Sequence, residues 1–269
     1  MKAKRHFGMH CYPLPKNAQG KTFFDNSLGY RRLARAFGYL ADEPGLGVLT
    51  GESGVGKTTA LRNLCTTLPQ PDYLIIYLCD TAIAPLDLYR GLALELGLRP
   101  SHRRAQLWAD IKAALLTLVD ERGNHPILVI DEAQHLSDAF LHDLGGFLNF
   151  AFDSRELFTM WLVGLPILSR RLRLLQHAAL LTRVSTEVHL ESLDRDTFGL
   201  AIEHGFKAAG ATSKSISDQA TEILFRSSRG LPRQAARLIR ASLRIAQERD
   251  QTFLDEPIIQ EAIEELGAP

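Results

Sequence analysis

The segment from Gly51 to Thr58 reads GESGVGKT and satisfies the spacing G-x-x-x-x-G-K-[ST] of a phosphate-binding loop. Glycines let the backbone wrap so that successive N–H groups point inward at phosphate oxygens. Lys57 is suited to the β- and γ-phosphates of a nucleoside triphosphate, and the Thr58 hydroxyl is suited to Mg²⁺. The residues expected to contact the nucleotide here are Gly51, Glu52, Ser53, Gly54, Val55, Gly56, Lys57, Thr58 and Thr59.

The surroundings of this loop distinguish it from a flexible glycine-rich turn. An apolar stretch at 46–50 predicts a strand before the loop, and residues 57–68 follow it with a helical pattern. A helix that begins at the loop directs the positive end of its dipole toward bound phosphate. We therefore interpret the loop as a binding site for ATP and Mg²⁺.

An acidic pair follows another apolar run, in ILVIDEAQHL at 127–136. A buried strand that ends in Asp131 would bring this carboxylate to the sheet edge, where it can hold Mg²⁺ through its water shell. Glu132 is then expected to orient and deprotonate the attacking water. The alternative is a surface turn whose acids only cap the next helix, and the phosphate-binding loop upstream disfavours it.

Strands and helices alternate along the middle of the chain, which predicts an α/β fold with a parallel sheet covered on both faces. The predicted strands are 46–50, 73–78, 127–130, 158–163 and 187–190. Helices are predicted near 28–41, 57–68, 86–97, 103–121, 138–150 and 169–181, and after Leu190 near 195–209, 216–227, 232–249 and 255–266. We expect a lead-in at 1–45, an ATPase core at 46–190 and a small all-α lid at 191–269.

Composition narrows the class of protein. The 269 residues include 31 Lys+Arg and 31 Asp+Glu, which argues against a highly basic tail but is compatible with a local basic patch. No apolar run is long enough to cross a bilayer, and no signal-peptide pattern follows the N-terminus. The three cysteines form no CxxC pair, which favours reduced thiols and a cytoplasmic location.

Two arginines lie where a hydrolytic site needs positive charge. Arg183 lies in LLTRVSTEVHL, before the last predicted strand, and Arg233 lies in RGLPRQAARLIR, at the start of a predicted lid helix. Positive charge on the departing γ-phosphate often comes from a neighbouring subunit. Pattern alone does not separate these two arginines from solvated surface charges.

Together, GESGVGKTT, ILVIDE, LLTRVS and GLPRQ resemble an AAA+ ATPase over nearly the whole chain. The resemblance implies a P-loop NTPase fold, with a five-stranded parallel sheet of order 5-1-4-3-2 and a C-terminal helical lid. It implies homo-oligomers with ATP at subunit interfaces, Arg183 as an arginine finger acting in trans, and Arg233 contacting the γ-phosphate from the lid. The lead-in at 1–45 would pack on the nucleotide site.

Within AAA+, the stretches HFGMHCYPLP, VLTGESGVGKTTALRNL, DEAQHL and GLPR resemble the ExeA-like group. That group includes transposition ATPases of the TniB, TnsC and MuB type. The resemblance implies a regulator of DNA transposition that forms filaments or rings on double-stranded DNA. Such a regulator recruits or activates a transposase, disassembles on ATP hydrolysis and needs no membrane.

Two alternatives stay open. An ExeA-like secretion-assembly ATPase carries a membrane span and a cell-wall-binding segment, so this sequence would have to be part of a longer protein. The second alternative is a protein that binds a nucleotide as a switch and hydrolyses it negligibly. Leu165 favours it, because it follows the fourth strand where these relatives usually have a polar residue that senses the γ-phosphate. Either another residue takes that role or hydrolysis is slow.

The candidate DNA surface is a cluster at a predicted helix start, in RPSHRRAQLW at 99–108. By the resemblance, this cluster and the loop 79–85 face the DNA, and the candidate contacts are Thr81, Ser101, His102, Arg103 and Arg104. A second basic feature repeats on one face of a lid helix and could meet DNA, another subunit or solvent: Arg233, Arg237, Arg240 and Arg244. No base-reading motif is present, which predicts sequence-independent, salt-sensitive binding.

Overall fold

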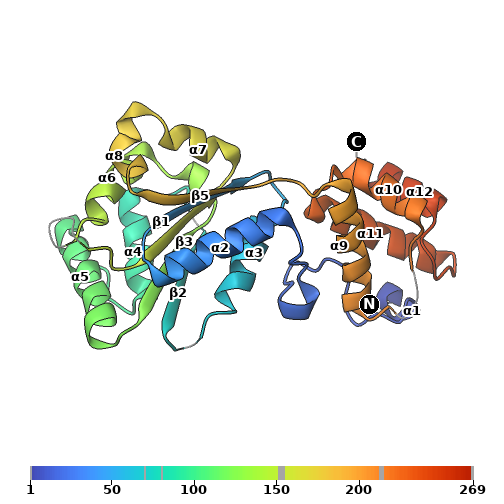
Figure 1. Ribbon diagram of the computed structural model, residues 1–269, viewed down its shortest axis with the longest axis horizontal. Coiled ribbons are helices and arrows are strands. Elements are labelled where there is room, and N and C mark those ends of the chain that lie inside the picture. The colour runs from blue at the N-terminus through green and yellow to red at the C-terminus, as the bar shows by residue number, and fades with distance from the viewer. Residues whose placement is uncertain (1, 70, 80, 151–154, 212–214, 268–269) are drawn as a thin grey trace. The chain divides into compact units, whose positions relative to one another are not determined.

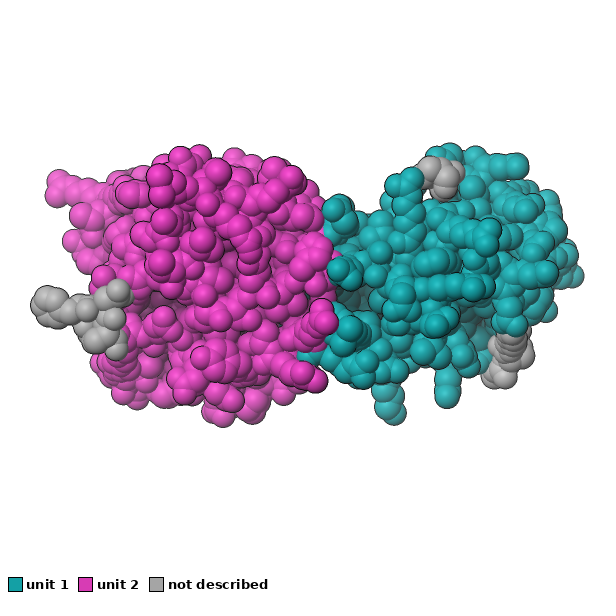
Figure 2. Space-filling model, turned by 45° about the horizontal axis from the view of Figure 1, so that its top comes forward, with its two compact units in different colours: residues 1–31, 52–63, 191–269 teal, residues 32–51, 64–190 magenta. Residues whose placement is uncertain are grey.

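A computed structural model describes residues 2–69, 71–79, 81–150, 155–211 and 215–267 (Figure 1). The chain divides into two compact units, coloured separately in Figure 2. One consists of residues 32–51 and 64–190 and is called the sheet unit below. The other consists of residues 1–31, 52–63 and 191–269 and is called the helical unit. The residues of the phosphate-binding loop after Gly51 thus group with the C-terminal helices.

The sheet unit contains five parallel strands: β1 (Leu46–Gly51), β2 (Tyr73–Leu78), β3 (His125–Ile130), β4 (Thr159–Gly164) and β5 (Val184–Leu190). Their order is β2-β3-β4-β1-β5, which confirms the α/β class and the expected order 5-1-4-3-2. β5 begins three residues before the predicted start at 187, because this edge strand alternates exposed and partly buried positions and has no continuous apolar run.

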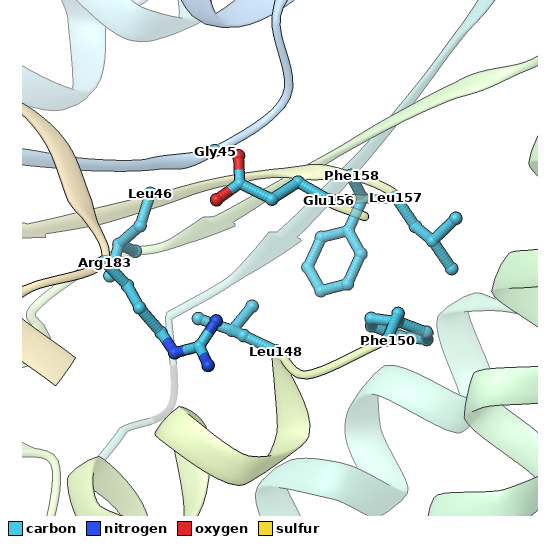
Figure 3. A pocket seen from close by; sticks show the side chains of 8 residues that line it. All are labelled: Gly45, Leu46, Leu148, Phe150, Glu156, Leu157, Phe158 and Arg183. Carbon is cyan, nitrogen blue, oxygen red and sulfur yellow. The ribbon is translucent and has the colours of Figure 1, made fainter. Parts of the chain in front are cut away.

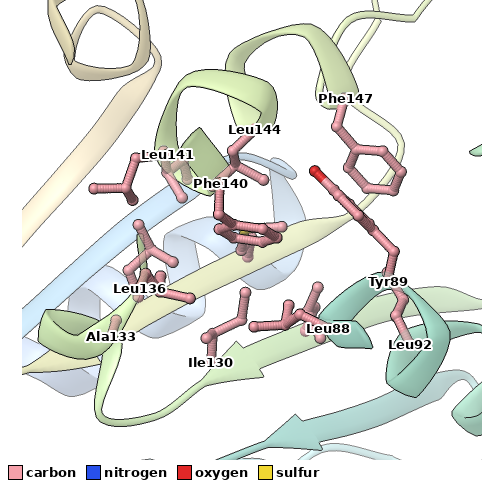
Figure 4. Packing of buried hydrophobic residues seen from close by; sticks show 14 of the residues in the cluster. Leu88, Tyr89, Leu92, Ile130, Ala133, Leu136, Phe140, Leu141, Leu144 and Phe147 are labelled. Carbon is pink, nitrogen blue, oxygen red and sulfur yellow. The ribbon is translucent and has the colours of Figure 1, made fainter. Parts of the chain in front are cut away.

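The larger core joins alternate strand residues to the helices α4 (Pro85–Glu95), α5 (Arg104–Leu116), α6 (Asp138–Phe147), α7 (Pro166–Leu172) and α8 (Ala178–Leu181). Figure 4 shows Tyr89 beside Phe140 and Phe147, with ring centroids 5.3 and 5.2 Å away.

A π-helical turn, η2 (Thr117–Glu121), ends the helix predicted over 103–121. Short 3₁₀ turns η3 (Ala133–His135) and η5 (Leu175–His177) follow β3 and α7.

Helix α2 (Leu28–Asp42) packs on the strands through Trp161 of β4, whose ring stacks on Phe37 at a centroid distance of 6.2 Å. Gly47 of β1 lies directly opposite Trp161 in the sheet register. A Cβ atom built on Gly47 would lie 2.7 Å from the indole ring. Only glycine therefore lets the buried indole lie across β1.

The helical unit buries a second apolar cluster among α9 (Arg195–Ala209), α10 (Asp218–Ser228), α11 (Pro232–Glu248) and α12 (Glu256–Leu266). The N-terminal helix α1 (Lys2–His6) adds Ala3 to this cluster, and Phe7, directly after the helix, also belongs to it. The unit also contains the turn η1 (Gly20–Thr22) and most of α3 (Lys57–Cys65). Across the described part of the chain, no helix combines the length and apolarity needed to span a bilayer.

We expect Gly47→Ala to lower the free energy of unfolding by about 1–3 kcal/mol, the usual cost of an added methyl group in a packed core. Gly38→Ala on α2 is the matched control, because a Cβ there meets nothing within 4 Å. Urea denaturation of both variants measures the difference. Equal midpoints for the two variants would contradict the packing role given to Gly47.

Candidate functional site

The phosphate-binding loop follows β1 and continues into α3 at Lys57. Gly54 and Gly56 have φ of +87° and +106°, conformations that favour glycine. The Lys57 ammonium donates a hydrogen bond to the Glu52 carbonyl at 3.1 Å, so it crosses the loop. Thr58 lies in the first turn of α3. The local geometry is therefore that of a loop whose backbone curves around one cationic group at a helix N-terminus.

Arg233 contacts this loop within the helical unit. Its guanidinium donates to the Ser53 hydroxyl at 3.3 Å, and its backbone N–H donates to the Gly54 carbonyl at 3.2 Å. A Cβ on Gly54 would lie 2.9 Å from the Cβ of Arg233, so glycine permits the close approach. The structure thus brings together the loop and the lid arginine that the sequence singled out.

The lead-in segment also packs on α3 within the helical unit. The Asn63 side chain accepts a hydrogen bond from the Gly20 N–H at 3.0 Å and donates one to the Tyr30 hydroxyl at 2.8 Å. Arg62 donates to the Lys16 carbonyl at 2.5 Å. Because Asn63 is 7% exposed, these bonds are partly shielded from water. They join residues 16–30 to the helix that begins at the phosphate-binding loop.

Asp131 is buried directly after β3, with 4% of its surface exposed. One carboxylate oxygen accepts the Tyr77 hydroxyl at 2.9 Å, and the other accepts the Glu132 N–H at 2.8 Å. Burial and the neighbouring Asp131 carboxylate raise the pKa of Tyr77, so its hydroxyl stays protonated as a donor. We did not foresee Tyr77 from the sequence; its position near the end of β2 is the only signal.

Glu132 is exposed and adopts a left-handed backbone conformation, with φ of +51°. Its carboxylate accepts a hydrogen bond from the Gln134 amide at 2.7 Å. Its carbonyl accepts the Thr81 hydroxyl at 2.9 Å. Thr81 is only 2% exposed, which removes it from the candidate DNA surface. Asp80, in the same expected DNA-facing loop, lies outside the described residues.

The segment after Glu132 is held to the end of β4 and to α7. The Leu165 N–H donates to the Gln134 side-chain oxygen at 3.0 Å. Arg171 of α7 donates to the carbonyls of Gln134 and Leu136 at 2.7 and 2.9 Å, and pairs with Asp138 at 2.5 Å. Sequence reasoning missed both Gln134 and Arg171, because the hydrogen bonds of Arg171 cross more than 30 residues of chain.

Arg183 lies at the opposite edge of the sheet from the acidic pair. It directly precedes β5 and lines a pocket with Gly45, Leu46, Leu148, Phe150, Glu156, Leu157 and Phe158 (Figure 3). Asp131 and Glu132 instead follow the carboxyl end of β3. At about 3.3 Å per strand residue and 4.8 Å between strands, the two positions are roughly 20 Å apart. Arg183 therefore does not reach the acidic pair of its own chain.

The residues of the candidate DNA cluster differ in their surroundings: Arg104 is engaged in contacts, whereas His102 and Arg103 are exposed. Arg104 forms an ion pair with Asp143 at 2.6 Å and lies over the Trp108 ring at 4.8 Å, so it is already engaged within the sheet unit. His102 and Arg103 are exposed, and the Arg103 N–H donates to the Ser101 hydroxyl at 3.2 Å. The exposed charge of this cluster thus lies just before the N-terminus of α5.

The arginine stripe on α11 is largely engaged within the helical unit. Arg240 lies over the Tyr12 ring at 5.6 Å. Arg244 pairs with Glu248 at 2.9 Å and with Glu265. These contacts favour intramolecular roles for the C-terminal half of the stripe over contact with DNA or another subunit.

Comparison with known proteins agrees with this geometry. Residues 41–172 match a family model described as an AAA domain. The chain is 28% identical over 240 residues to general secretion pathway protein A of Aeromonas hydrophila. That match covers 84% of this chain and 42% of the relative, so the chain spans less than half of the relative's length.

Solved structures show the same fold. Cdc6p from Pyrobaculum aerophilum matches with a TM-score of 0.72 at 17% identity, over 97% of this chain and 70% of that one. Drosophila ORC bound to DNA matches with a TM-score of 0.72 at 16% identity, over all of this chain and 67% of that one. The chain therefore has the AAA+ P-loop fold, and it is similar in sequence to general secretion pathway protein A.

Loss of charge on Asp138 should reveal how the Arg171 contact contributes to stability. The Arg171 hydrogen bond lowers the pKa of Asp138 below its ordinary value of 3.8, with a smaller contribution from His177. A lowered folded-state pKa stabilises the fold above the unfolded pKa, and this contribution is lost as the pH falls through the folded value. Asp138→Asn should thus be less stable than the wild type at pH 7, by a margin that shrinks below pH ~4. Urea midpoints at several pH values measure the margin, and a constant margin would contradict the assignment.

Proposed function

We propose that this protein is an ATP- and Mg²⁺-dependent AAA+ ATPase that assembles on double-stranded DNA and regulates DNA transposition. The observation that carries the assembly part of the proposal is the separation of Arg183 from the acidic pair along the length of the parallel sheet. In this arrangement Arg183 cannot act as an arginine finger for the acidic pair of its own chain. Hydrolysis then needs a second copy, which makes assembly part of the chemistry.

Each part of the proposed nucleotide site has a chemical role. Residues 51–59 would hold the phosphates, with Lys57 on the β- and γ-phosphates and Arg233 on the γ-phosphate. Thr58 and Asp131 would hold Mg²⁺, which neutralises phosphate charge as the bond to the leaving group breaks. Glu132 would accept the proton of the attacking water. Tyr77 supports this arrangement by orienting the Asp131 carboxylate.

Interfaces of the head-to-tail kind generate rings or filaments, and they place one edge of each subunit against the opposite edge of the next. Arg183 on one edge and the acidic pair on the other suit such an interface. ATP at the junction would favour assembly, and hydrolysis would release it.

Mixing two inactive variants tests this arrangement. Arg183→Ala should lower ATP turnover by about 10³-fold or more, the usual contribution of an arginine finger. Glu132→Gln should lower it by about 10²- to 10⁴-fold, the usual contribution of a general base. A mixture should recover activity, because Glu132→Gln subunits supply Arg183 to the intact sites of Arg183→Ala subunits. A mixture as inactive as its components would contradict an arginine finger acting in trans.

Duplex DNA is the proposed surface for this assembly. His102 and Arg103 are exposed beside the N-terminus of α5, where free backbone N–H groups add to the attraction for phosphate. Likeness of fold to an ORC structure bound to DNA adds support at the level of fold only. The formal net charge of zero means that binding depends on this local patch rather than on the whole chain.

We expect Arg103→Ala to weaken ATP-dependent DNA binding and to reduce the salt slope, log K against log [salt], by about 1. Arg122→Ala is the matched control, because Arg122 is exposed at the other end of the same helical segment. Fluorescence anisotropy with duplex DNA at several salt concentrations measures both. Equal salt slopes for the two variants would remove Arg103 from the proposed DNA surface. Equal DNA binding with and without ATP would contradict ATP-dependent assembly on DNA.

A secretion-assembly ATPase is the second candidate, favoured by the 28% identity to general secretion pathway protein A. Electron microscopy of Glu132→Gln with ATP and duplex DNA separates the candidates. Filaments or rings on DNA, together with activation of a transposase, support the transposition role. Active ATP hydrolysis without DNA binding at low salt supports the secretion role, and nucleotide binding without turnover supports a simple switch.

A further inference from the structure

Gln134 connects Glu132 to Leu165 at the end of β4, two positions that the sequence singled out separately. Its side chain lies between the Glu132 carboxylate and the end of β4, at 2.7 Å from Glu132 Oε2 and 3.0 Å from the Leu165 nitrogen. Leu165 itself offers no polar side chain there. The segment that follows β3 therefore supplies a polar side chain at this strand end.

The two hydrogen bonds determine which way the carboxamide faces. The Leu165 N–H can only donate, so it requires the side-chain oxygen of Gln134. The Glu132 carboxylate can only accept, so it requires the NH₂ group. A reversed amide would place oxygen against a carboxylate and NH₂ against N–H. One orientation thus satisfies both partners, and it leaves Glu132 Oε1 outside this pair of bonds.

Gly164 provides the space for this orientation. A Cβ on Gly164 would lie 2.7 Å from the Gln134 side-chain oxygen and 3.2 Å from its backbone nitrogen. Arg171 holds the Gln134 carbonyl from the other side at 2.7 Å. The position of Gln134 is therefore fixed at both its backbone and its side chain.

We propose that Gln134 is a positioning residue for Glu132, held at the end of β4 by its hydrogen bond to Leu165. This inference rests on the proposed ATP hydrolysis. Glu132 is exposed, so its side chain has little packing around it to fix its orientation. The Gln134 NH₂ group anchors one carboxylate oxygen and so directs the other toward the attacking water. Fixed orientation of a general base contributes to the rate without changing substrate affinity.

Two substitutions at Gln134, one of them repeated in a Glu132→Gln background, test this positioning role. Gln134→Met keeps the length and removes both hydrogen bonds, and we expect kcat for ATP to fall about 10- to 100-fold with KM unchanged. Gln134→Glu keeps an acceptor for Leu165 but replaces the donor with a negative charge, so kcat should fall at least as far. In a Glu132→Gln background, Gln134→Met should change the residual rate no further.

Gly164→Ala tests the same role without altering Gln134. It should reproduce the loss of kcat, whereas Gly145→Ala on α6, where a Cβ meets nothing within 4 Å, should retain wild-type turnover. Binding of a fluorescent ATP analogue and urea unfolding confirm that each variant is folded and still holds nucleotide.

The outcomes separate this inference from the proposed function. A wild-type protein that binds ATP but does not hydrolyse it, with or without DNA, overturns the proposed function. A wild-type protein that hydrolyses ATP while Gln134→Met matches its kcat overturns the inference alone. Full activity of Gln134→Glu, or an equal loss from Gln134→Met in the Glu132→Gln background, would show a structural role in place of the positioning role.

Discussion

All five strands run in the same direction, and this shared direction controls where chemistry can occur in the sheet unit. Residues that follow strands gather at one edge, and residues that precede strands gather at the other. Asp131 and Glu132 belong to the first group, while Arg183 belongs to the second. Since each strand has six or seven residues, side chains cannot close the distance between the edges. The proposed need for a second copy follows from this polarity.

Close backbone approaches allow the functional loops to pack. Gly54 lets the start of α11 reach the phosphate-binding loop, and Gly164 leaves space for the Gln134 carboxamide. Gly47 has a comparable role in the core, where it accommodates the Trp161 ring. In each case the missing Cβ is the condition for another group to take its place, so these glycines act through space as well as through backbone freedom.

The acidic pair depends on a small network of neutral and charged donors. Tyr77 holds Asp131, Gln134 holds Glu132, and Arg171 holds the segment that carries Gln134. A carboxylate that must bind a metal or accept a proton needs one orientation, and each of these donors removes an alternative one. Gln134 is itself hydrogen-bonded to Leu165 and Arg171, so the exposed Glu132 carboxylate is held by a group whose own position is fixed.

Local signals in the sequence located four of the strands, most of the helices and the phosphate-binding loop. The single helix predicted at 169–181 is instead α7, η5 and α8 in the structure. A run of buried residues makes β1, β3 and β4 visible, and the glycine and lysine spacing identifies the loop because backbone conformation depends on neighbouring residues. The strand order came from the family resemblance, and the structure confirms it. The edge strand β5 was recognised only in part, since half-exposed strands carry a weaker pattern.

Side-chain partners across the fold were beyond the sequence. Thr81 and Arg104 belong to segments with a surface-like composition, yet one is buried against Glu132 and the other is paired with Asp143. Gln134 gained its role only when β3 and β4 were placed side by side. Composition and spacing thus determined the loop, the acidic pair and the α/β class by themselves. Tertiary packing decided which polar groups meet, because those contacts join residues distant in sequence.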